Sequence, residues 1–281
     1  MSQSKPQNSV AVAEAYYDSD DAHAFYREIW GGEDIHIGLY DPPDLDIASA
    51  SHATVVKLAQ MIDGLGKDTR VLDIGAGYGG AARYLARTFG CHVTCLNLSD
   101  VQNAYNEKKN REQELGSLVR VVHGNFEALP FEDGAFDVVW SQDAILHSGN
   151  RAKVLCEVAR VLAPGGQFVF TDPMQADDCP EGVLQPIFDR IHLASLGSPA
   201  FYRGEMKKLG MNEKAFVPLL SHLELHYARI GEELARRRVE IEGHGGSAAA
   251  YVERMLAGLK NWVDGAKAKH LMWGMFHFVK P

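Results

Sequence analysis

The sequence is poor in cysteine, and its few cysteines lack the spacing that metal and redox sites use. Only four occur among 281 residues, and none forms a C-x-x-C pair: Cys91, Cys95, Cys156 and Cys179. The first two fall on a predicted buried strand, where cysteine packs as a small apolar side chain. The 12 histidines include no H-E-x-x-H pair. The sequence therefore indicates neither a disulfide framework nor a zinc site, and no metal is expected.

Basic residues are also scarce. The chain has 28 Lys and Arg against 37 Asp and Glu, which gives a formal net charge of -9 and a pI near 5.7. Binding to nucleic acid needs clustered Lys and Arg that neutralise phosphates, so a nucleic-acid partner is not expected. The one basic run, Arg236-Arg237-Arg238, lies in a predicted helix beside several glutamates and indicates a solvated, salt-bridged face.

Long apolar runs are missing as well. No stretch approaches the roughly 20 apolar residues that span a bilayer, and residues 1–9 are polar without the apolar core of a signal peptide. We therefore expect a cytoplasmic protein with no membrane partner. Its hydrophobic content of 46% suffices for a large core. The oligomeric state is left open, with a homodimer as one arrangement.

One stretch, residues 71–80, organises the rest of the chain. Its sequence is VLDIGAGYGG, an apolar run that ends in a glycine-rich turn. The pattern predicts a buried parallel strand, a tight turn and a helix over 81–88, because glycine lets the backbone bend and approach a ligand closely. Gly75, Gly77 and Gly80 satisfy G-x-G-x-x-G, so a nicotinamide or flavin dinucleotide is one candidate ligand and another nucleoside cofactor is the alternative.

Asp73 favours a nucleoside cofactor other than a dinucleotide. A carboxylate two residues before the first glycine suits a cationic ligand better than a pyrophosphate, and S-adenosylmethionine carries a sulfonium and an ammonium group. The stretch resembles the first motif of the class I S-adenosylmethionine-dependent methyltransferases, which has the same hydrophobic-Asp-hydrophobic-Gly-x-Gly form. A dinucleotide oxidoreductase, which bound nicotinamide or flavin would reveal, and a non-catalytic module that only binds the cofactor remain as rivals.

From Arg70 onward, predicted strands and helices alternate, which indicates a parallel sheet covered on both faces. Strands are expected at 71–74, 92–96, 119–123, 136–141, 167–171, near 215–220 and at 271–279; helices at 49–65, 81–88, 100–115, 152–161, 223–242 and 247–267. The predicted fold is α/β: a doubly wound, Rossmann-like, seven-stranded and mostly parallel sheet with an antiparallel last strand and a helical cap. We divide the chain into an N-terminal helical segment that covers the cleft (1–66), a cofactor-binding core (67–172), a cap insertion (173–214) and a completion of the core (215–281).

The segment 161–167, VLAPGGQ, closely resembles the methyltransferase motif between the fourth helix and the fifth strand. Pro164 is expected to end the helix, and Gly165 and Gly166 to adopt positive φ before the strand restarts. This segment closes the sheet rather than taking part in chemistry.

Cofactor-binding residues are expected at the carboxyl ends of the strands, where open α/β sheets bind ligands. Asn97, about 20 residues beyond the glycine turn, is placed to accept from the ribose hydroxyls, with help from Gln102. Asn125 is placed at the adenine amino group, with Phe126 beside it. Both asparagines stand where the resembling enzymes commonly have a carboxylate, and either residue can instead serve only as a turn residue. The resemblance implies further contacts from Asp73, Gly75, Ala76, Gly77, Leu98 and Gln142.

The segments outside the core narrow the substrate. Residues 17–40, 141–147, 191–203 and 273–281 resemble the bacterial and algal sarcosine/dimethylglycine N-methyltransferases of glycine betaine synthesis. The resemblance covers nearly the whole chain, although sterol, tocopherol and phosphoethanolamine methyltransferases share the core and parts of the aromatic N-terminal segment. The expected reaction is transfer of a methyl group to the nitrogen of a small amino acid, and another small-molecule acceptor is the alternative.

In this chemistry a neutral amine attacks a sulfonium methyl group. The enzyme must therefore remove water from the two reactants and align them, more than it must activate the amine. The aromatic faces of Tyr17, Tyr26, Trp30 or Trp273 can stabilise the cations by cation–π attraction, or can simply pack in the core. Tyr26 is also a candidate catalytic residue.

Three further residues are candidates for the substrate site. Arg190 or Arg203 is expected to bind the substrate carboxylate bidentately, unless it forms a surface ion pair instead. His147, after the fourth strand, is expected either to accept the amine proton or to orient the substrate, unless it is structural.

Overall fold

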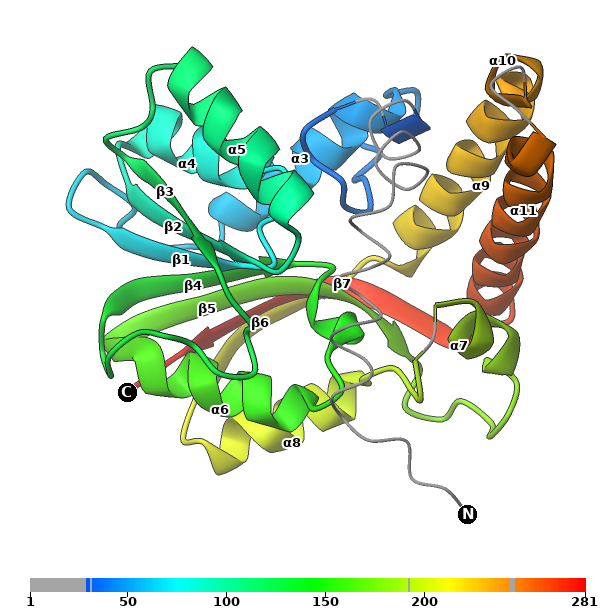
Figure 1. Ribbon diagram of the computed structural model, residues 1–281. Helices are drawn as coiled ribbons and strands as arrows, with labels where there is room; N and C mark the ends of the chain where they lie inside the picture. The colour runs from blue at the N-terminus through cyan, green and yellow to red at the C-terminus, as the bar shows by residue number, and fades with distance from the viewer. Residues whose placement is uncertain (1–28, 31, 192, 243–245) are drawn as a thin grey trace.

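The computed structural model describes residues 29–30, 32–191, 193–242 and 246–281, which form a sheet with helices on both faces (Figure 1). The strands are β1 (Arg70–Ile74), β2 (His92–Asn97), β3 (Val119–His123), β4 (Phe136–Gln142), β5 (Leu162–Gln175), β6 (Asn212–Pro218) and β7 (Leu271–Val279). They lie in the order β3-β2-β1-β4-β5-β7-β6. Strands β1 to β5 pair in parallel, and β7 runs antiparallel to both β5 and β6. The predicted fold class is confirmed.

The core is divided between the two faces of the sheet because successive residues of a strand point in opposite directions. Val71 packs on one face with Leu85 of α4 (Gly80–Phe89), and Leu72 packs on the other with Val158 of α6 (Arg151–Val161). In Figure 1, α3 (Ile47–Ala59), α4 and α5 (Asp100–Glu112) lie above the sheet, whereas α6 and α8 (Pro199–Lys208) lie below it. The buried strands thus hold their carboxyl ends at one edge between two helical layers.

Three helices in the described part of the chain connect β6 to β7 in the sequence. Helix α9 (Leu220–Arg236) packs along α11 (Gly246–Lys267), with α10 (Arg238–Glu242) between them in sequence, and α7 (Gln185–Ile191) contacts α11. The basic run is paired with glutamates, as predicted: Arg236–Glu233 at 2.6 Å, Arg237–Glu240 at 2.9 Å and Arg238–Glu253 at 2.6 Å.

Several predicted bounds differ from the structure. The helix expected over 49–65 ends at Ala59, before Gly64 turns with φ 73°. Strand β5 is longer than 167–171 because β7 pairs with it from Gln167 as far as Gln175. The expectation of positive φ holds for Gly165, at 77°, but not for Gly166. Gly166 is required for space instead, since a Cβ there would lie 2.7 Å from the Ala163 carbonyl oxygen.

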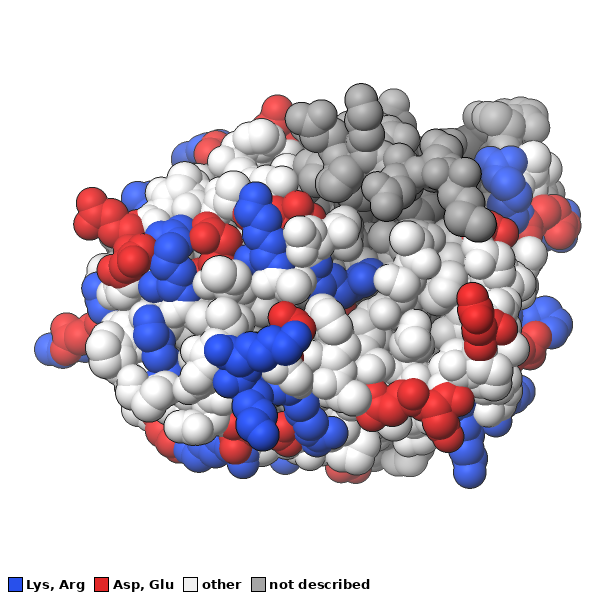
Figure 2. Space-filling view, turned by 90° about the horizontal axis from the view of Figure 1, so that it is seen from below, with Lys and Arg blue, Asp and Glu red and all other residues white. Residues whose placement is uncertain are grey.

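The lower surface carries charges of both signs. Figure 2 views the molecule from below, and Lys and Arg side chains lie among Asp and Glu on this face. The helices below the sheet contribute ion pairs such as Arg160–Glu157 on α6, at 2.8 Å, and Lys208–Glu205 on α8, at 2.5 Å. None of the helices in the described part of the chain combines the length and the apolar character needed to cross a bilayer.

Candidate active site

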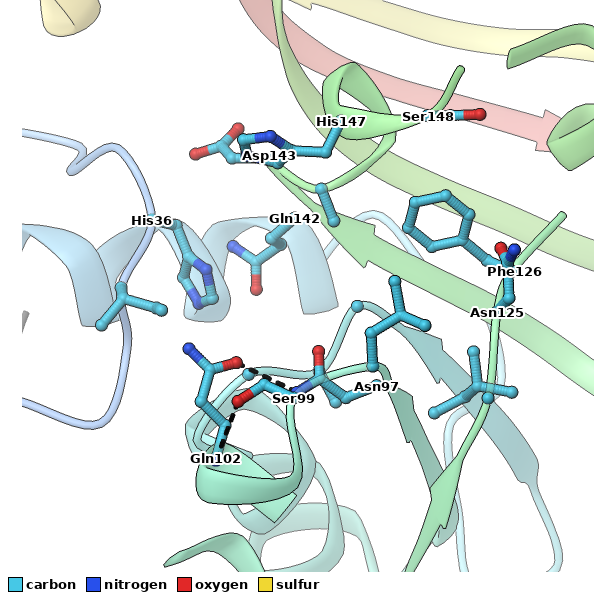
Figure 3. Close-up of a pocket in the computed structure, with 18 of the residues that line it drawn as sticks. His36, Asn97, Ser99, Gln102, Asn125, Phe126, Gln142, Asp143, His147 and Ser148 are labelled. Atoms are coloured by element: carbon cyan, nitrogen blue, oxygen red, sulfur yellow. Dashed lines mark hydrogen bonds between the residues drawn. The ribbon is translucent and has the colours of Figure 1, made fainter. Parts of the chain in front are cut away.

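A pocket lies at the carboxyl ends of β1, β2 and β4 (Figure 3). Four segments from the core line it: the glycine turn after β1, the start of α5, the loop after β3 and residues 142–148. Residues 35 and 36, which precede the core, complete the wall. The predicted site residues that line this one pocket are Gly75, Ala76, Gly77, Asn97, Leu98, Gln102, Asn125, Phe126, Gln142 and His147.

The glycine turn is joined to the neighbouring strand. The backbone N–H groups of Gly75 and Ala76 donate to the Leu96 carbonyl oxygen at 2.8 and 3.2 Å. Gly75 has φ 81°, and a Cβ there would lie 2.4 Å from the Cβ of Ala144. Both the conformation and the close approach therefore require glycine at position 75.

Asn97 and Gln102 lie together, as expected. The Asn97 Nδ2 group donates to Gln102 Oε1 at 3.0 Å. Ser99 Oγ caps α5 by accepting from the Gln102 backbone N–H at 3.2 Å, which fixes the helix beside β2. The amide pair leaves one acceptor, Asn97 Oδ1, and one donor group, Gln102 Nε2, which suits the two hydroxyls of a ribose.

Asn125 serves in the turn as well as in the pocket wall. Its Oδ1 accepts from the Glu127 backbone N–H at 2.8 Å, which closes an Asx turn after β3. Phe126, only 9% exposed, follows it and lines the same pocket. Asn125 can therefore close this turn and also contact a ligand in the pocket.

The side-chain amide of Gln142 has an N–H group that is not used in a hydrogen bond within the described residues. Its Oε1 accepts from the Trp140 indole N–H at 3.0 Å, and because that nitrogen can only donate, the amide orientation is fixed. Nε2 is buried and has no hydrogen-bond partner in the described part of the chain. A ligand that offers an acceptor would satisfy it, and Gln142 extends into the pocket (Figure 3).

Asp143 connects four parts of the fold. Its carboxylate accepts from the Ile37 backbone N–H at 2.7 Å, from Thr171 Oγ1 at 2.8 Å and from Trp273 Nε1 at 2.9 Å. Burial raises the pKa of Asp143, while these donors oppose the shift. Its backbone φ of 49° is unusual for a residue other than glycine. Such outliers often occur at functional sites.

His147 lies in a short 3-10 helix, Ile145–His147, on the pocket wall. Burial, together with the positive charge of Arg151, lowers its pKa to about 4. The imidazole is therefore neutral at neutral pH. The backbone N–H of Leu146 donates to Asp172 Oδ1 at 2.9 Å, which fixes this segment to β5.

Other predicted site residues do not line the pocket. Asp73 is 3% exposed within β1, and burial raises its pKa to about 7. Trp30 is buried and donates through Nε1 to the His36 carbonyl oxygen at 3.0 Å. Trp273 is fully buried, so its ring is a support for Asp143 rather than a face presented to a ligand.

Neither predicted arginine reaches the pocket. The Arg203 guanidinium pairs with Glu213 at 2.8 Å and lies over the Phe216 ring, 4.9 Å from its centre. Arg190 contacts Met255 Sδ of α11. The structure thus places Arg203 in the surface ion pair that was the alternative to its expected role as a carboxylate anchor. Tyr17 and Tyr26 lie outside the described residues.

Sequence reasoning missed several residues of the pocket wall. Ile35 and His36 line it, and Asp143, Glu127 and Ser148 do so as well. His36 stands between two isoleucines, and a polar side chain enclosed in an apolar segment was the available signal.

Comparisons with known proteins all show similarity to methyltransferases. Residues 72–170 match the sequence family described as "Methyltransferase domain". The chain is 52% identical over 272 residues to the sarcosine/dimethylglycine N-methyltransferase of Halorhodospira halochloris, and the match covers 97% of each protein. It is 49% identical to the enzyme of the same name from Aphanothece halophytica, over 96% of each. A crystal structure from Galdieria sulphuraria, provisionally named sarcosine dimethylglycine methyltransferase, superposes with a TM-score of 0.89 at 41% identity, covering 94% of this chain and 98% of that one.

Proposed function

Because the chain belongs to the sarcosine/dimethylglycine N-methyltransferase family, we propose that it methylates the nitrogen of sarcosine or dimethylglycine, in the second case forming glycine betaine. The observation that supports this proposal most strongly is that the 52% identity extends over 272 residues. It covers 97% of the chain and so includes the segments outside the methyltransferase domain, residues 72–170.

S-adenosylmethionine is the cofactor of this enzyme family, and the pocket residues fit it. We assign Asn97 and Gln102 to the ribose hydroxyls, and Asn125 and Phe126 to the adenine. The unpartnered Gln142 Nε2 and the open backbone of the glycine turn suit the methionine portion. When bound, the cofactor supplies a methyl group on a positively charged sulfur.

The chain's own contribution to the reaction is alignment and exclusion of water. The Asp143 carboxylate, held by three donors, places a fixed negative potential beside the cationic ligands. With its lowered pKa, His147 is a neutral polar group that orients the substrate rather than a strong base. The expected contributions of Tyr17 and Tyr26, the segment boundaries at 66, 172 and 214, the cytoplasmic location and the homodimer stay predictions.

The proposal is tested by incubating the protein with methyl-labelled S-adenosylmethionine and a panel of acceptors. We expect label in dimethylglycine or sarcosine, with phosphoethanolamine and sterols unmodified, measured by mass spectrometry. Transfer to a phosphobase or a sterol, with none to the two amino acids, would contradict the assigned acceptor and leave the methyltransferase fold intact.

A further inference from the structure

His36 is held firmly at the edge of the pocket. Its carbonyl oxygen accepts from Trp30 Nε1 at 3.0 Å and from Ser51 Oγ at 2.9 Å. The next two backbone N–H groups donate to Asp143 Oδ2 at 2.7 Å and to His226 Nδ1 at 3.1 Å. Four hydrogen bonds, two of them to residues more than 100 positions away, therefore fix the backbone that carries this imidazole, and its side chain extends into the pocket (Figure 3).

A buried carboxylate lies behind the ring. His36 Nε2 is 3.7 Å from Asp34 Oδ1, and both atoms are shielded from solvent with no hydrogen-bond partner in the described residues. The other oxygen of Asp34 contacts His52 Nδ1 at 2.9 Å. Burial alone would raise the pKa of Asp34, but the contacts with His36 and His52 hold it well below its usual range. Asp34 is therefore an anion that faces Nε2.

The two ring nitrogens of His36 occupy different surroundings. Nε2 faces Asp34 and is inaccessible, whereas 12% of the side chain remains exposed and borders the pocket. A carboxylate that faces one imidazole nitrogen favours the proton on that nitrogen by charge attraction, and the other nitrogen then carries the lone pair. By this arrangement Nδ1 is the nitrogen available to a ligand.

We propose that His36, oriented by Asp34, accepts the proton that the substrate ammonium group must lose before methyl transfer. The proposal rests on the proposed function, because an alkylamine near the basicity of lysine is mostly protonated at neutral pH. The substrate N–H bond breaks, its electron pair stays on nitrogen and the proton moves to His36 Nδ1. The freed lone pair then forms the bond to the methyl carbon as the bond from that carbon to sulfur breaks.

The charged surroundings of His36 support this role. Within the described residues, Asp34, Asp73 and Asp143 interact with it electrostatically, and so does His226. Burial, followed by the charge of His36, lowers the pKa of His226 to about 3, so that ring stays neutral. His147 also lines the pocket, but with its pKa lowered to about 4 it is a weak acceptor. His36 is therefore the pocket histidine that faces a buried carboxylate, Asp34.

The test compares His36→Gln, Asp34→Asn and a control, His123→Gln, across pH 6 to 10. His123 is a matched control because its Nε2 also lies near an aspartate, 3.9 Å from Asp100, but its side chain is 53% exposed and does not line the pocket. We expect His36→Gln to lower kcat/KM for dimethylglycine at pH 7 by about 100-fold. The deficit should shrink towards pH 10, because free amine then no longer needs an acceptor. Asp34→Asn should act in the same direction by about 10-fold.

Binding of S-adenosylhomocysteine, measured by calorimetry, separates this role from a structural one. We expect both variants to keep its Kd within about threefold, less than half of the 1.4 kcal/mol that a tenfold change represents. A deficit that is equal at every pH, or no deficit, would overturn the role of His36 while the wild-type enzyme still methylates dimethylglycine. A wild-type enzyme inactive on both amino acids would overturn the proposed function and this proposal with it.

Discussion

The carboxylate of Asp143 accepts a hydrogen bond from the indole nitrogen of Trp273 at 2.9 Å, across 130 residues of sequence. Asp143 lines the pocket, whereas Trp273 lies on β7, the one antiparallel strand. The same carboxylate also binds the backbone of Ile37. A single half-buried side chain thus joins the last strand and the N-terminal segment to the wall of the pocket.

Trp273→Phe should destabilise the protein beyond the effect of lost packing, because it leaves a half-buried carboxylate oxygen of Asp143 short of one donor. We expect about 1–3 kcal/mol more loss in the free energy of unfolding than for Trp262→Phe, measured by urea denaturation. Trp262 is the control because its buried ring stacks on Tyr227, 5.1 Å between centres. Equal losses in the two variants would show that the bond to Asp143 is not stabilising.

Gly75→Ala should abolish cofactor binding. The new Cβ would lie 2.4 Å from Ala144 Cβ, in a backbone with φ 81°. Gly64→Ala is the matched control, since Gly64 has φ 73° with open space around it and reports the conformational strain alone. We expect S-adenosylhomocysteine affinity, measured by calorimetry, to fall by more than about 100-fold only for Gly75→Ala. Retained affinity would contradict the close packing of this turn.

The fold was predictable because its determinants are local. Strands β1 and β7 are almost wholly buried, so each is a short apolar run: the run at 71–74 lies within β1, and the run at 271–279 matched β7 residue for residue. The length of β5 was not predictable from its own residues. Its extension to Gln175 follows from pairing with β7, about a hundred residues later in the chain, where Gln175 pairs with Leu271.

The clustering of the proposed cofactor-binding residues in one pocket was predictable for a similar reason. Gly75 follows β1, and Asn97 and Gln142 are the last residues of β2 and β4; because the carboxyl ends of these neighbouring strands meet, the three residues lie together. The surroundings of the proposed substrate-binding residues were not predictable, because the sequence around an arginine or a tryptophan does not indicate which residue it will contact. Arg203 forms an ion pair with Glu213, and Trp273 donates a hydrogen bond to Asp143. No sequence pattern specifies these tertiary contacts.

Asn97→Ala should weaken S-adenosylhomocysteine binding by about 0.5–1.5 kcal/mol, the net value of a hydrogen bond. Gln102→Ala should have an effect of similar size, because the two amides are bonded to each other at 3.0 Å. The double variant should lose less than the sum, since each single change already disturbs the pair. Calorimetry on the four proteins measures this coupling, and strict additivity would show that the two side chains act independently.

Arg203→Ala should leave KM for dimethylglycine unchanged. The Arg203 side chain is 43% exposed and pairs with Glu213 away from the pocket, so it has no route to a bound substrate. Loss of the exposed ion pair should cost about 0–1 kcal/mol of stability in a denaturation experiment. A strong rise in KM, partly rescued by Arg203→Lys, would instead restore the carboxylate-anchor role that the sequence suggested.

Asp172 should make stability fall with rising pH. Burial raises its pKa to about 7, opposed by the Tyr202 hydroxyl, which donates at 2.6 Å. Between the unfolded pKa of about 3.9 and about 7, the folded state binds more protons than the unfolded state, so the free energy of unfolding decreases across this range.

Asp172→Asn removes this titration, and the decrease in stability between pH 4 and 8 should become smaller by up to about 4 kcal/mol, measured by urea denaturation. Asp137→Asn is the control of opposite sign. The Arg70 guanidinium holds the pKa of Asp137 below its usual value, so Asp137 contributes stability that is lost as pH falls. An unchanged pH dependence in Asp172→Asn would mean that Asp172 stays ionised in the folded protein. In that case the hydrogen bonds from Tyr202 and Leu146, rather than burial, would determine its charge.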